Sequence, residues 1–196
     1  MSERRQELLA KIIEYLVEHG VADLSLRPLA QAIGSSARLL IFHFKSKEDL
    51  IEEALREVQT RLKTSFGALS AQDPARRRHT PMKAFWLWAI DKRNLPYLRL
   101  LYEMHFIALQ NPRRYARYLQ QSALSWVDII EQRLPETIRS KATATLCGAV
   151  FDGLLIELLG TGDRARTTQA LDRFVAMLVR EHETQSHTRK RRSKSA

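Results

Sequence analysis

The residues best suited to chemistry in this chain lie between positions 25 and 47, in the stretch SLRPLAQAIGSSARLLIFHFKSK. Within it, the sequence predicts a helix over residues 36–45, and the outer face of this helix mixes cationic with apolar side chains. That face consists of Arg38, Leu39, Ile41, Phe42 and Lys45. A guanidinium can read guanine, and apolar atoms can contact thymine methyl groups. The composition therefore predicts a helix that enters the major groove of DNA.

Lys47 begins a further predicted helix, over residues 46–66, where its charge opposes the helix macrodipole. The free backbone N–H groups at the same end can bind a phosphate, and Lys47 adds a cation to them. Ser46 can cap this helix, with Asp49 completing an arrangement close to a capping box. We expect a phosphate-binding site here, and a solvated surface lysine is the alternative.

Two earlier helices must position these side chains. Apolar residues recur at helical spacing over residues 9–17, and Gly20 can end that helix in a left-handed conformation. Ser25 is placed to cap the second helix, and Pro28 falls in its first turn, where no N–H is needed.

The second and third helices are joined by a tight turn. Gly34 ends the second helix, and either serine of the pair at 35–36 can cap the third. Ala37, Leu40 and Phe44 share the inward face of the third helix. Two helices that cross at such a turn leave the second one projecting, as in a helix-turn-helix.

Residues 34–47, GSSARLLIFHFKSK, resemble the DNA-binding signature of the TetR (tetracycline-repressor) family of transcription regulators. That signature is a glycine, a small residue, a serine, three variable residues, Leu-Tyr-aromatic-His-Phe, any residue and Ser-Lys. The resemblance covers about the first quarter of the chain. It implies DNA contact by Ser25, Arg27, Ser36, Ala37, Arg38, Leu39, Ile41, Phe42, His43, Lys45 and Lys47.

The resemblance also implies a role for several of these positions. Arg27 matches a residue that reaches a base or phosphate, and residues 37–39 match the variable positions that choose bases. Phe42 matches an aromatic that lies against the DNA, and His43 matches a histidine that contacts the backbone. Ile41 stands where the family usually has tyrosine, and Phe42 also lacks a hydroxyl. Two phosphate hydrogen bonds are therefore expected to be missing.

The charge of the chain is basic, with 32 Lys and Arg against 22 Asp and Glu, but residues 1–66 hold ten of each sign. Net charge therefore does not identify the DNA-binding region. Half of the excess lies in residues 189–194, within a basic tail that we expect to be disordered. Such a tail can bind DNA non-specifically or serve only solubility.

Composition excludes several classes of protein. No nucleophile–base pair, phosphate-binding glycine loop or metal-ligand spacing is evident, so we expect no enzyme activity, catalytic residue, cofactor or metal. Cys147 is the single cysteine, which fits a reducing cytoplasm. The N-terminus lacks a signal-peptide core, and no uninterrupted apolar span approaches about 18 residues, so no membrane partner is expected.

The fold class predicted is all-α, an N-terminal three-helix helix-turn-helix domain followed by a larger helical ligand-binding and dimerisation domain. After a polar loop at 67–80, prolines and glycines divide the chain into helices. These span about 81–92, 95–109, 112–133, 135–159 and 164–182. The domains predicted are 1–46 for DNA binding, 47–182 for effector binding and dimerisation, and 183–196 for the disordered tail.

The last two helices are the predicted dimer interface, because two such hairpins can form a four-helix bundle about a two-fold axis. The same apolar stripes can instead serve the core of the protomer. The predicted interface residues are Ala149, Val150, Gly153, Leu154, Leu158, Leu171, Phe174, Val175 and Leu178.

An aromatic-rich region lies between the DNA-binding helices and this hairpin. In the family that the chain resembles, this region encloses a small-molecule pocket whose occupation spreads the DNA-reading heads. By burial habit alone each aromatic is more often a core residue. The candidate pocket residues are Phe85, Trp86, Trp88, Tyr97, Tyr102, Glu103, His105, Phe106 and Trp126.

The sequence therefore predicts a ligand-responsive, dimeric DNA-binding regulator, a repressor by the family's commonest mode. It would bind a palindromic double-stranded operator and release it when an unidentified apolar or aromatic small molecule binds. The alternatives are a helical dimeric adaptor without operator recognition and a non-specific DNA binder that acts through its basic tail.

Overall fold

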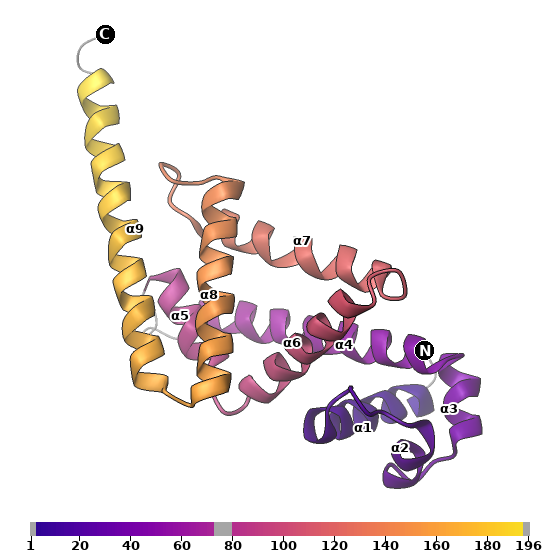
Figure 1. The fold of residues 1–196 in the computed structure, drawn as a ribbon. Helices are drawn as coiled ribbons and strands as arrows, with labels where there is room; N and C mark the ends of the chain where they lie inside the picture. Colours follow the sequence, from indigo (N-terminus) through magenta and orange to yellow (C-terminus); the bar gives the residue numbers. More distant parts are fainter. Residues whose placement is uncertain (1–2, 73–79, 194–196) are drawn as a thin grey trace. The chain divides into compact units, whose positions relative to one another are not determined.

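The computed structural model describes residues 3–72 and 80–193, without the side chains of residues 68–72, 121–125 and 185–193. Within these ranges the regular elements are helices, and no strand occurs, as the sequence predicts (Figure 1). The helices are α1 (Glu3–His19), α2 (Leu26–Ala32), α3 (Ala37–Phe44), α4 (Lys47–Gln72), α5 (Pro81–Ala89), α6 (Leu95–Gln110), α7 (Ala116–Arg133), α8 (Lys141–Thr161) and α9 (Arg164–Ser193).

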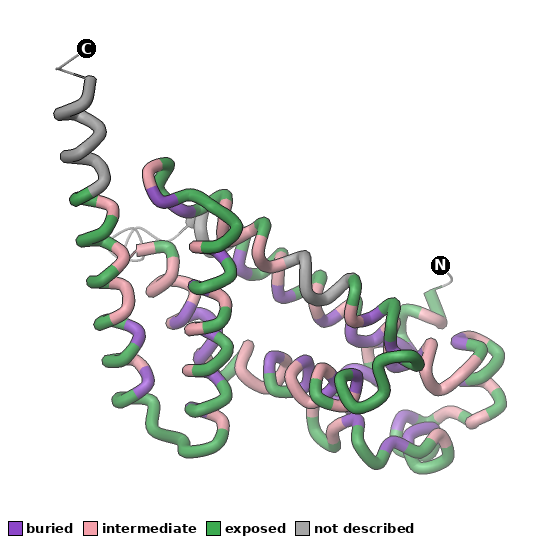
Figure 2. Tube along the Cα trace, turned by 45° about the horizontal axis from the view of Figure 1, so that its top comes forward, coloured by how far each residue is buried: buried purple, intermediate pink, exposed green. Residues whose placement is uncertain are grey.

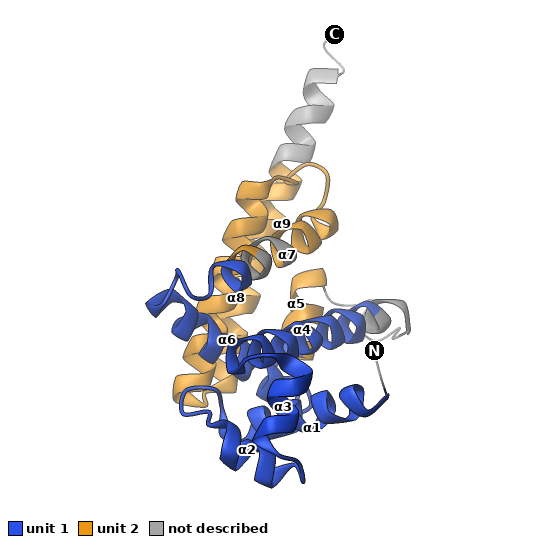
Figure 3. Ribbon diagram, turned by 90° about the vertical axis from the view of Figure 1, so that its right-hand side faces the viewer, with its two compact units in different colours: residues 1–72, 89–119 blue, residues 73–88, 120–196 orange. Residues whose placement is uncertain are grey.

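The chain divides into two compact units that cut across the predicted domain boundaries. Unit 1 contains residues 1–72 and 89–119, and unit 2 contains residues 73–88 and 120–196 (Figure 3). The predicted DNA-binding helices thus share one unit with the whole of α4 and α6. The boundary predicted at residue 46 is not a boundary of this unit.

Unit 1 is built on the apolar stripes of α1 and α4. Ile12 and Leu16 of α1 are fully buried, as are Leu50, Leu55 and Val58 of α4. Their spacing places them on one face of each helix, which is the amphipathic pattern of helices that share a core. Figure 2 shows how buried positions alternate with intermediate and exposed ones along the helices.

Unit 2 contains the α8–α9 hairpin. Gly162 ends α8 in a left-handed conformation with φ of 71°, and α9 begins two residues later. One apolar cluster in this unit consists of Leu134, Ile138, Ala144 and Cys147. Burial raises the pKa of the Cys147 thiol, so this side chain is a core residue with little thiolate character.

Several helix boundaries differ from the predicted ones. α4 runs through Gly67 to Gln72, past the predicted end at residue 66, because one exposed glycine costs a helix only about 1 kcal/mol. Residues 73–79 of the predicted loop lie outside the described residues.

α8 begins at Lys141 and not at the predicted residue 135. The reason is capping: Ser140 is extended and its hydroxyl accepts a hydrogen bond of 3.1 Å from the N–H of Thr143. Similarly, α7 begins at Ala116 rather than residue 112. Pro135 and Pro112 lie in the turns before these helices.

α9 continues to Ser193, past the predicted end at residue 182, because no glycine or proline interrupts it. The basic side chains of the predicted tail, at 189–194, lie outside the described residues. In the described part of the chain, α8 is the one helix long and apolar enough to cross a membrane by length and composition alone. Its only charged residues are Lys141, Asp152 and Glu157.

Candidate nucleic-acid interface

The turn between α2 and α3 is closed by backbone hydrogen bonds of its own. Gly34 has a φ of 67°, and the N–H of Ser35 returns to the carbonyl of Ala30 at 2.8 Å. This is a Schellman motif, in which the left-handed residue lets the next N–H cap the helix. The turn chemistry predicted for Gly34 is confirmed, and the motif sets the angle at which α3 leaves α2.

α3 has one buried face and one exposed face. The hydroxyl of Ser36 caps it, accepting from the N–H of Leu39 at 3.2 Å. Leu40 and Phe44 are buried, as predicted, whereas Phe42 is 77% exposed. The other members of the predicted DNA-reading set on this helix are half-buried (Ala37, Leu39, His43) or exposed (Arg38, Ile41). A phenylalanine this exposed on a short, cation-flanked helix indicates a contact surface.

A strained turn separates α3 from α4. Lys45 has a φ of 69° and a ψ of −50°, and the N–H of Ser46 bonds to the carbonyl of Phe44 at 2.9 Å. These values describe a γ-turn with positive φ, a conformation that side chains disfavour. The turn starts α4 immediately after α3, and its exposed central lysine lies beside the outer face of α3.

The start of α4 is capped as predicted. The hydroxyl of Ser46 accepts from the N–H of Asp49 at 3.0 Å and donates to its carboxylate at 2.8 Å. Lys47 is half-buried, and its ammonium donates to the carbonyl of Leu24 at 3.1 Å, just before α2. Because an ammonium has three donors, Lys47 can link α4 to α2 and still bind a phosphate.

Ser25 and Arg27 lie at the exposed start of α2. Ser25 occupies the N-cap position with an extended backbone, but its side chain makes no capping hydrogen bond among the described residues. The predicted cap is therefore wrong. The hydroxyl remains on the surface beside Arg27, where a phosphate can approach both groups.

Arg5 joins α1 to α3 and α4. Its guanidinium donates to Glu53 at 2.6 Å and to the carbonyl of His43 at 3.3 Å. It also lies over the ring of Phe44, 5.0 Å from the centroid. A cation at the C-terminal carbonyls of α3 is favourable for the helix dipole. The sequence analysis did not identify Arg5, because nothing in its local pattern predicts contacts with residues about forty positions away.

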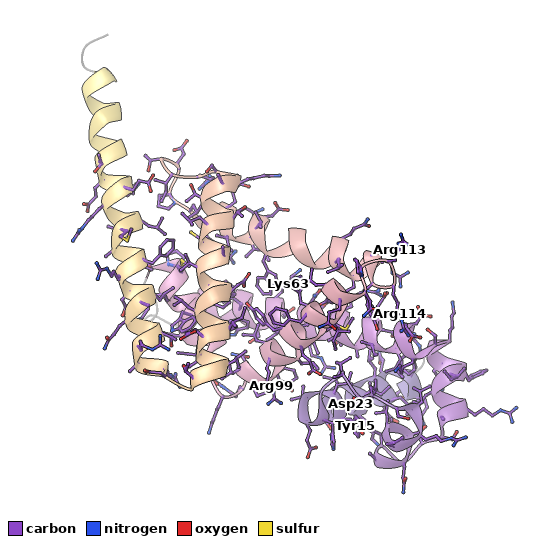
Figure 4. The ribbon with its side chains drawn as sticks, viewed as in Figure 1. Tyr15, Asp23, Lys63, Arg99, Arg113 and Arg114 are labelled. Carbon is purple, nitrogen blue, oxygen red and sulfur yellow. The ribbon has the colours of Figure 1, made fainter. Side chains whose placement is uncertain are left out.

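The first turns of α4 are acidic and are neutralised by the segment before and within α7. Arg117 binds Glu52 at 2.7 Å, and Arg114, which is labelled in Figure 4, pairs with Glu48. Each of these arginines therefore removes one negative charge from the neighbourhood of Lys47. Without them, carboxylates near the start of α4 would repel a phosphate.

The structure divides the predicted effector residues between the two units. Phe85 in unit 2 has ring centroids 5.3 Å from Trp88, 5.5 Å from Trp126 and 4.6 Å from Phe151. Trp86 is fully buried, and its indole N–H donates to Thr168 at 2.9 Å. The remaining candidates, Tyr97, Tyr102, Glu103, His105 and Phe106, are on α6 in unit 1.

Glu103 has a role that the sequence did not predict. Its carboxylate accepts the N–H groups of Val21 and Ala22, at 2.7 and 2.9 Å. Both N–H groups donate to the same carboxylate oxygen. Glu103 therefore completes the turn between α1 and α2, and its place among the candidate pocket residues stays a prediction.

The predicted dimer residues separate into buried and exposed ones. Leu158 and Leu171 are buried within the protomer, and Phe174 and Leu178 pack against the cluster that contains Cys147. Those four therefore belong to the protomer's own packing, the alternative left open by the sequence. Ala149 and Gly153 are exposed, and Val150, Leu154 and Val175 are half-buried.

Four large apolar side chains of the hairpin are exposed. They are Leu146 (51%), Ile156 (43%), Met177 (60%) and Val179 (40%). Six of the exposed positions on α8 recur at alternating steps of four and three residues, at Ala142, Leu146, Ala149, Gly153, Ile156 and Gly160, with Asp152 and Glu157 exposed beside them. This is the spacing of a helix seam. In the ranges described, no group of three or more His, Cys, Asp or Glu side chains is placed to hold a metal ion.

Comparison with known proteins agrees with this geometry. Residues 8–54 match the family model described as bacterial regulatory proteins, tetR family. No curated protein matches the sequence. A transcriptional regulator from Rhodococcus sp. Rha1 is 20% identical, with a TM-score of 0.74 over 90% of this chain and 96% of that one.

Two other solved structures are slightly more similar in sequence. A member of the TetR family from Streptomyces coelicolor A3 is 25% identical, with a TM-score of 0.61 over 88% of this chain and 98% of that one. The multidrug binding protein EbrR, complexed with proflavin, is 26% identical, with a TM-score of 0.58 over 87% of this chain and 99% of that one. The predicted resemblance and fold class are confirmed, and the matches support a DNA-binding transcriptional regulator.

Proposed function

We propose that this chain, a tetR-family DNA-binding regulator by its residues 8–54, is a homodimeric repressor that a small aromatic effector releases from a palindromic operator. The observation that carries the DNA-binding part is the outer face of α3. Phe42 is 77% exposed and Ile41 is 40% exposed, between the exposed cations Arg38 and Lys45. Apolar groups of this size are tolerated in water when a groove covers them in the bound state.

The remaining predicted contacts support DNA binding through phosphates. Lys47 keeps donors to spare beside the N–H groups at the start of α4, and Ser25 and Arg27 lie exposed at the start of α2. Phosphate contacts of this kind set the position of a protein on DNA, whereas base contacts set the sequence. Within the proposal, α3 contacts the bases, and the starts of α2 and α4 bind phosphates of the DNA backbone.

The dimer is supported by the exposed seam of α8. Small residues alternate with Leu146 and Ile156 along it, and no described atom lies within 4 Å of the position that a Cβ would take at Gly153 or Gly160. An uncharged stripe of this kind lets a partner helix approach closely. It also accounts for the apolar composition of α8 without a membrane, since a second copy would cover it. Two heads related by a two-fold axis match two half-sites of a palindrome.

The effector is supported by the aromatic residues of unit 2. Phe85 and Trp88 stack at 5.3 Å, and both Phe85 and Trp126 are half-buried. Ligand sites are apolar with a few polar groups, and stacked aromatic rings favour a planar ligand. EbrR has been crystallised with proflavin, which is planar and aromatic. A planar aromatic molecule is therefore the first class of effector to test on this chain.

The experiment is selection of bound duplexes from random DNA at moderate salt. Wild type is compared with the double variant Arg38→Ala/Phe42→Ala and with a chain that ends at Thr184. The matched control is Leu109→Ala/Arg113→Ala, which also removes an exposed apolar group and an exposed cation, but from the end of α6 and the segment after it. We expect wild type, the shortened chain and the control to enrich one palindrome that the α3 double variant loses.

Two outcomes contradict the proposal. If no sequence is enriched and residual binding disappears with residues 185–196, the chain is a non-specific binder that acts through its basic end. If no duplex binds in any form of the protein, the adaptor alternative stands. Proflavin is then titrated against the wild-type complex, and failure of it and of other planar aromatics to release the palindrome would remove the effector part.

A further inference from the structure

The C-terminal end of α1 is completed by a side chain of α6. The N–H of Gly20 closes the helix on the carbonyl of Leu16 at 2.8 Å. The next two N–H groups, of Val21 and Ala22, both donate to one carboxylate oxygen of Glu103, at 2.7 and 2.9 Å. Groups just past a helix end need partners from elsewhere, and here α6 supplies them.

The end of α2 shows what a self-sufficient helix end looks like in the same unit. Its left-handed residue, Gly34, is followed by Ser35, whose N–H bonds back to Ala30 within the same helix. The equivalent N–H at the end of α1 belongs to Val21, and it bonds to Glu103 instead. The two ends therefore differ in one respect: the N–H after the left-handed residue bonds within its own helix in α2 and to α6 in α1.

A second side chain of α6 binds the same end of α1. The guanidinium of Arg99, labelled in Figure 4, donates to the carbonyl of Val17 at 3.0 Å. A cation at the C-terminal carbonyls of a helix is favourable. Arg99 and Glu103 are four residues apart, so they project from the same face of α6. Together they bind both kinds of backbone group at this helix end, one carbonyl and two N–H groups.

Gly20 leaves the room that this contact needs. A Cβ at this position would lie 2.8 Å from both carboxylate oxygens of Glu103, which is closer than real side chains approach. Gly20 also has a φ of 80°, a conformation that favours glycine. The glycine therefore serves the turn and also the approach of α6.

α1 is in turn fixed to the DNA-reading helix. Arg5, near the start of α1, binds the carbonyl of His43 and lies over the ring of Phe44, both in α3. A continuous series of contacts thus runs from α6 through α1 to α3, all within unit 1. Coupling between distant sites can be carried by packed side chains and hydrogen bonds of this kind.

We propose that Glu103, assisted by Arg99, is a positioning residue for DNA binding: it fixes the α1–α2 turn to α6 and so sets the placement of α2 and α3. This inference rests on the DNA-binding function proposed above and adds to it the residue that holds the DNA-reading helices to α6. Glu103 acts through the backbone of residues 21–22 and does not itself contact DNA.

The test combines amide hydrogen exchange with affinity for the selected palindrome. In Glu103→Ala, we expect the amides of Val21 and Ala22 to exchange at least about tenfold faster and the operator Kd to rise about tenfold, the size of a lost charge-assisted contact. Glu103→Gln keeps the shape and an acceptor oxygen, so it should fold and recover part of both losses. Gln110→Ala, at the exposed end of the same helix, is the control and should change neither.

A second experiment approaches the contact from the glycine. Gly20→Ala and Gly34→Ala both place a side chain at positive φ, but only Gly20 faces Glu103, since no described atom lies within 4 Å of the Cβ position at Gly34. We expect Gly20→Ala to be much less damaging to stability when Glu103 is already alanine. The effect of Gly34→Ala should be the same in both backgrounds.

The outcomes separate this inference from the proposed function. If wild type enriches no palindrome, the proposed function fails, and the positioning role fails with it, whereas exchange at residues 21–22 still reports whether α6 holds the turn. If wild type binds and Glu103→Ala binds equally well, the inference is overturned and the function stands. Faster exchange without any loss of operator affinity would also overturn it, because Glu103 would then be only a local cap.

Discussion

α3 and α8 both expose large apolar side chains, but the surroundings of those side chains differ. On α3, Phe42 and Ile41 lie between the exposed cations Arg38 and Lys45. On α8, the exposed leucine and isoleucine lie in a stripe of alanine and glycine, with carboxylates and no exposed cation beside its centre. An apolar group beside cations suits an anionic groove that also offers methyl groups, whereas an uncharged, small-residue stripe suits close approach by another apolar helix. The side chains around an exposed apolar residue therefore indicate whether DNA or another protein helix is the better candidate to cover it.

The two helices also differ in how the protomer holds them. α3 is fixed by polar contacts from α1, above all those of Arg5, and by capped turns at both ends. The inner face of α8 is fixed by apolar packing, in which Cys147, Phe151 and Leu155 are buried. Directional contacts set an orientation, which a base-reading helix needs. Apolar packing sets a surface, which is enough for a dimer seam.

The largest effect is expected from Gly153→Arg on α8. An arginine there would place a long charged side chain where the proposed seam needs close helix approach, so the dimer dissociation constant should rise at least about a hundredfold. Light scattering at micromolar concentration measures this. Gly67→Arg on α4 is the control, because no described atom approaches that glycine either and the variant should remain a dimer. A monodisperse Gly153→Arg dimer would contradict the assignment of α8.

The next effect concerns the polar support of α3. Arg5→Ala removes a contact between side chains that are only 22% and 21% exposed, and it leaves Glu53 without that partner. We expect unit 1 to lose about 2 kcal/mol of unfolding free energy in urea. Arg4→Ala breaks a pair that is more than half exposed and should cost under about 0.5 kcal/mol. Equal effects of the two variants would show that Arg5 does not support α3.

Single apolar truncations separate the two surfaces. Phe42→Ala should weaken operator binding by about 1–2 kcal/mol with unfolding free energy and dimerisation unchanged. Leu146→Ala should weaken dimerisation by a similar amount. Both side chains are more than half exposed, so neither truncation opens a cavity in the core. Operator titrations and sedimentation of both variants measure these two effects. If either variant weakened operator binding and dimerisation equally, the two surfaces would not be distinct.

The smallest effect comes from the γ-turn after α3. Lys45→Gly should raise the unfolding free energy by about 1 kcal/mol, because glycine adopts a φ of 69° without strain. Arg38→Gly, at an exposed position inside α3, should lower it by about 1 kcal/mol, because glycine weakens a helix interior. Urea denaturation checks both signs. A loss of stability in Lys45→Gly would mean that its side chain contributes more than its backbone costs.

The local features of α2, α3 and the start of α4 were predictable from the sequence. Gly34, Ser36 and Ser46 act on residues within five positions of themselves, so the turn, the cap of α3 and the cap of α4 could be read from spacing. The inward and outward faces of α3 followed from helical periodicity. The TetR-family match covers the same region, residues 8–54, because that signature encodes these short-range interactions.

The contacts that the sequence did not predict share a different property. Glu103 bonds to residues more than eighty positions earlier in the chain, and Leu158 and Leu171 are buried by packing that no single helix pattern reveals. In the sequence, Glu103 lies among aromatic residues, which suggests a ligand-binding group. Only the structure shows that two backbone N–H groups from the α1–α2 turn donate to it. From the sequence alone, an apolar stripe on α8 can face either the core of its own protomer or a partner, and only the packing of neighbouring helices distinguishes the two.

The sequence by itself determined the helices, the turn between α2 and α3, and the chemistry displayed on α3, because these depend on interactions between near neighbours in the chain. Only the tertiary structure decided that α6 completes the end of α1 through Glu103 and that α8 keeps Leu146 and Ile156 outward. Those features depend on contacts between distant segments, which fold together only when the whole core forms.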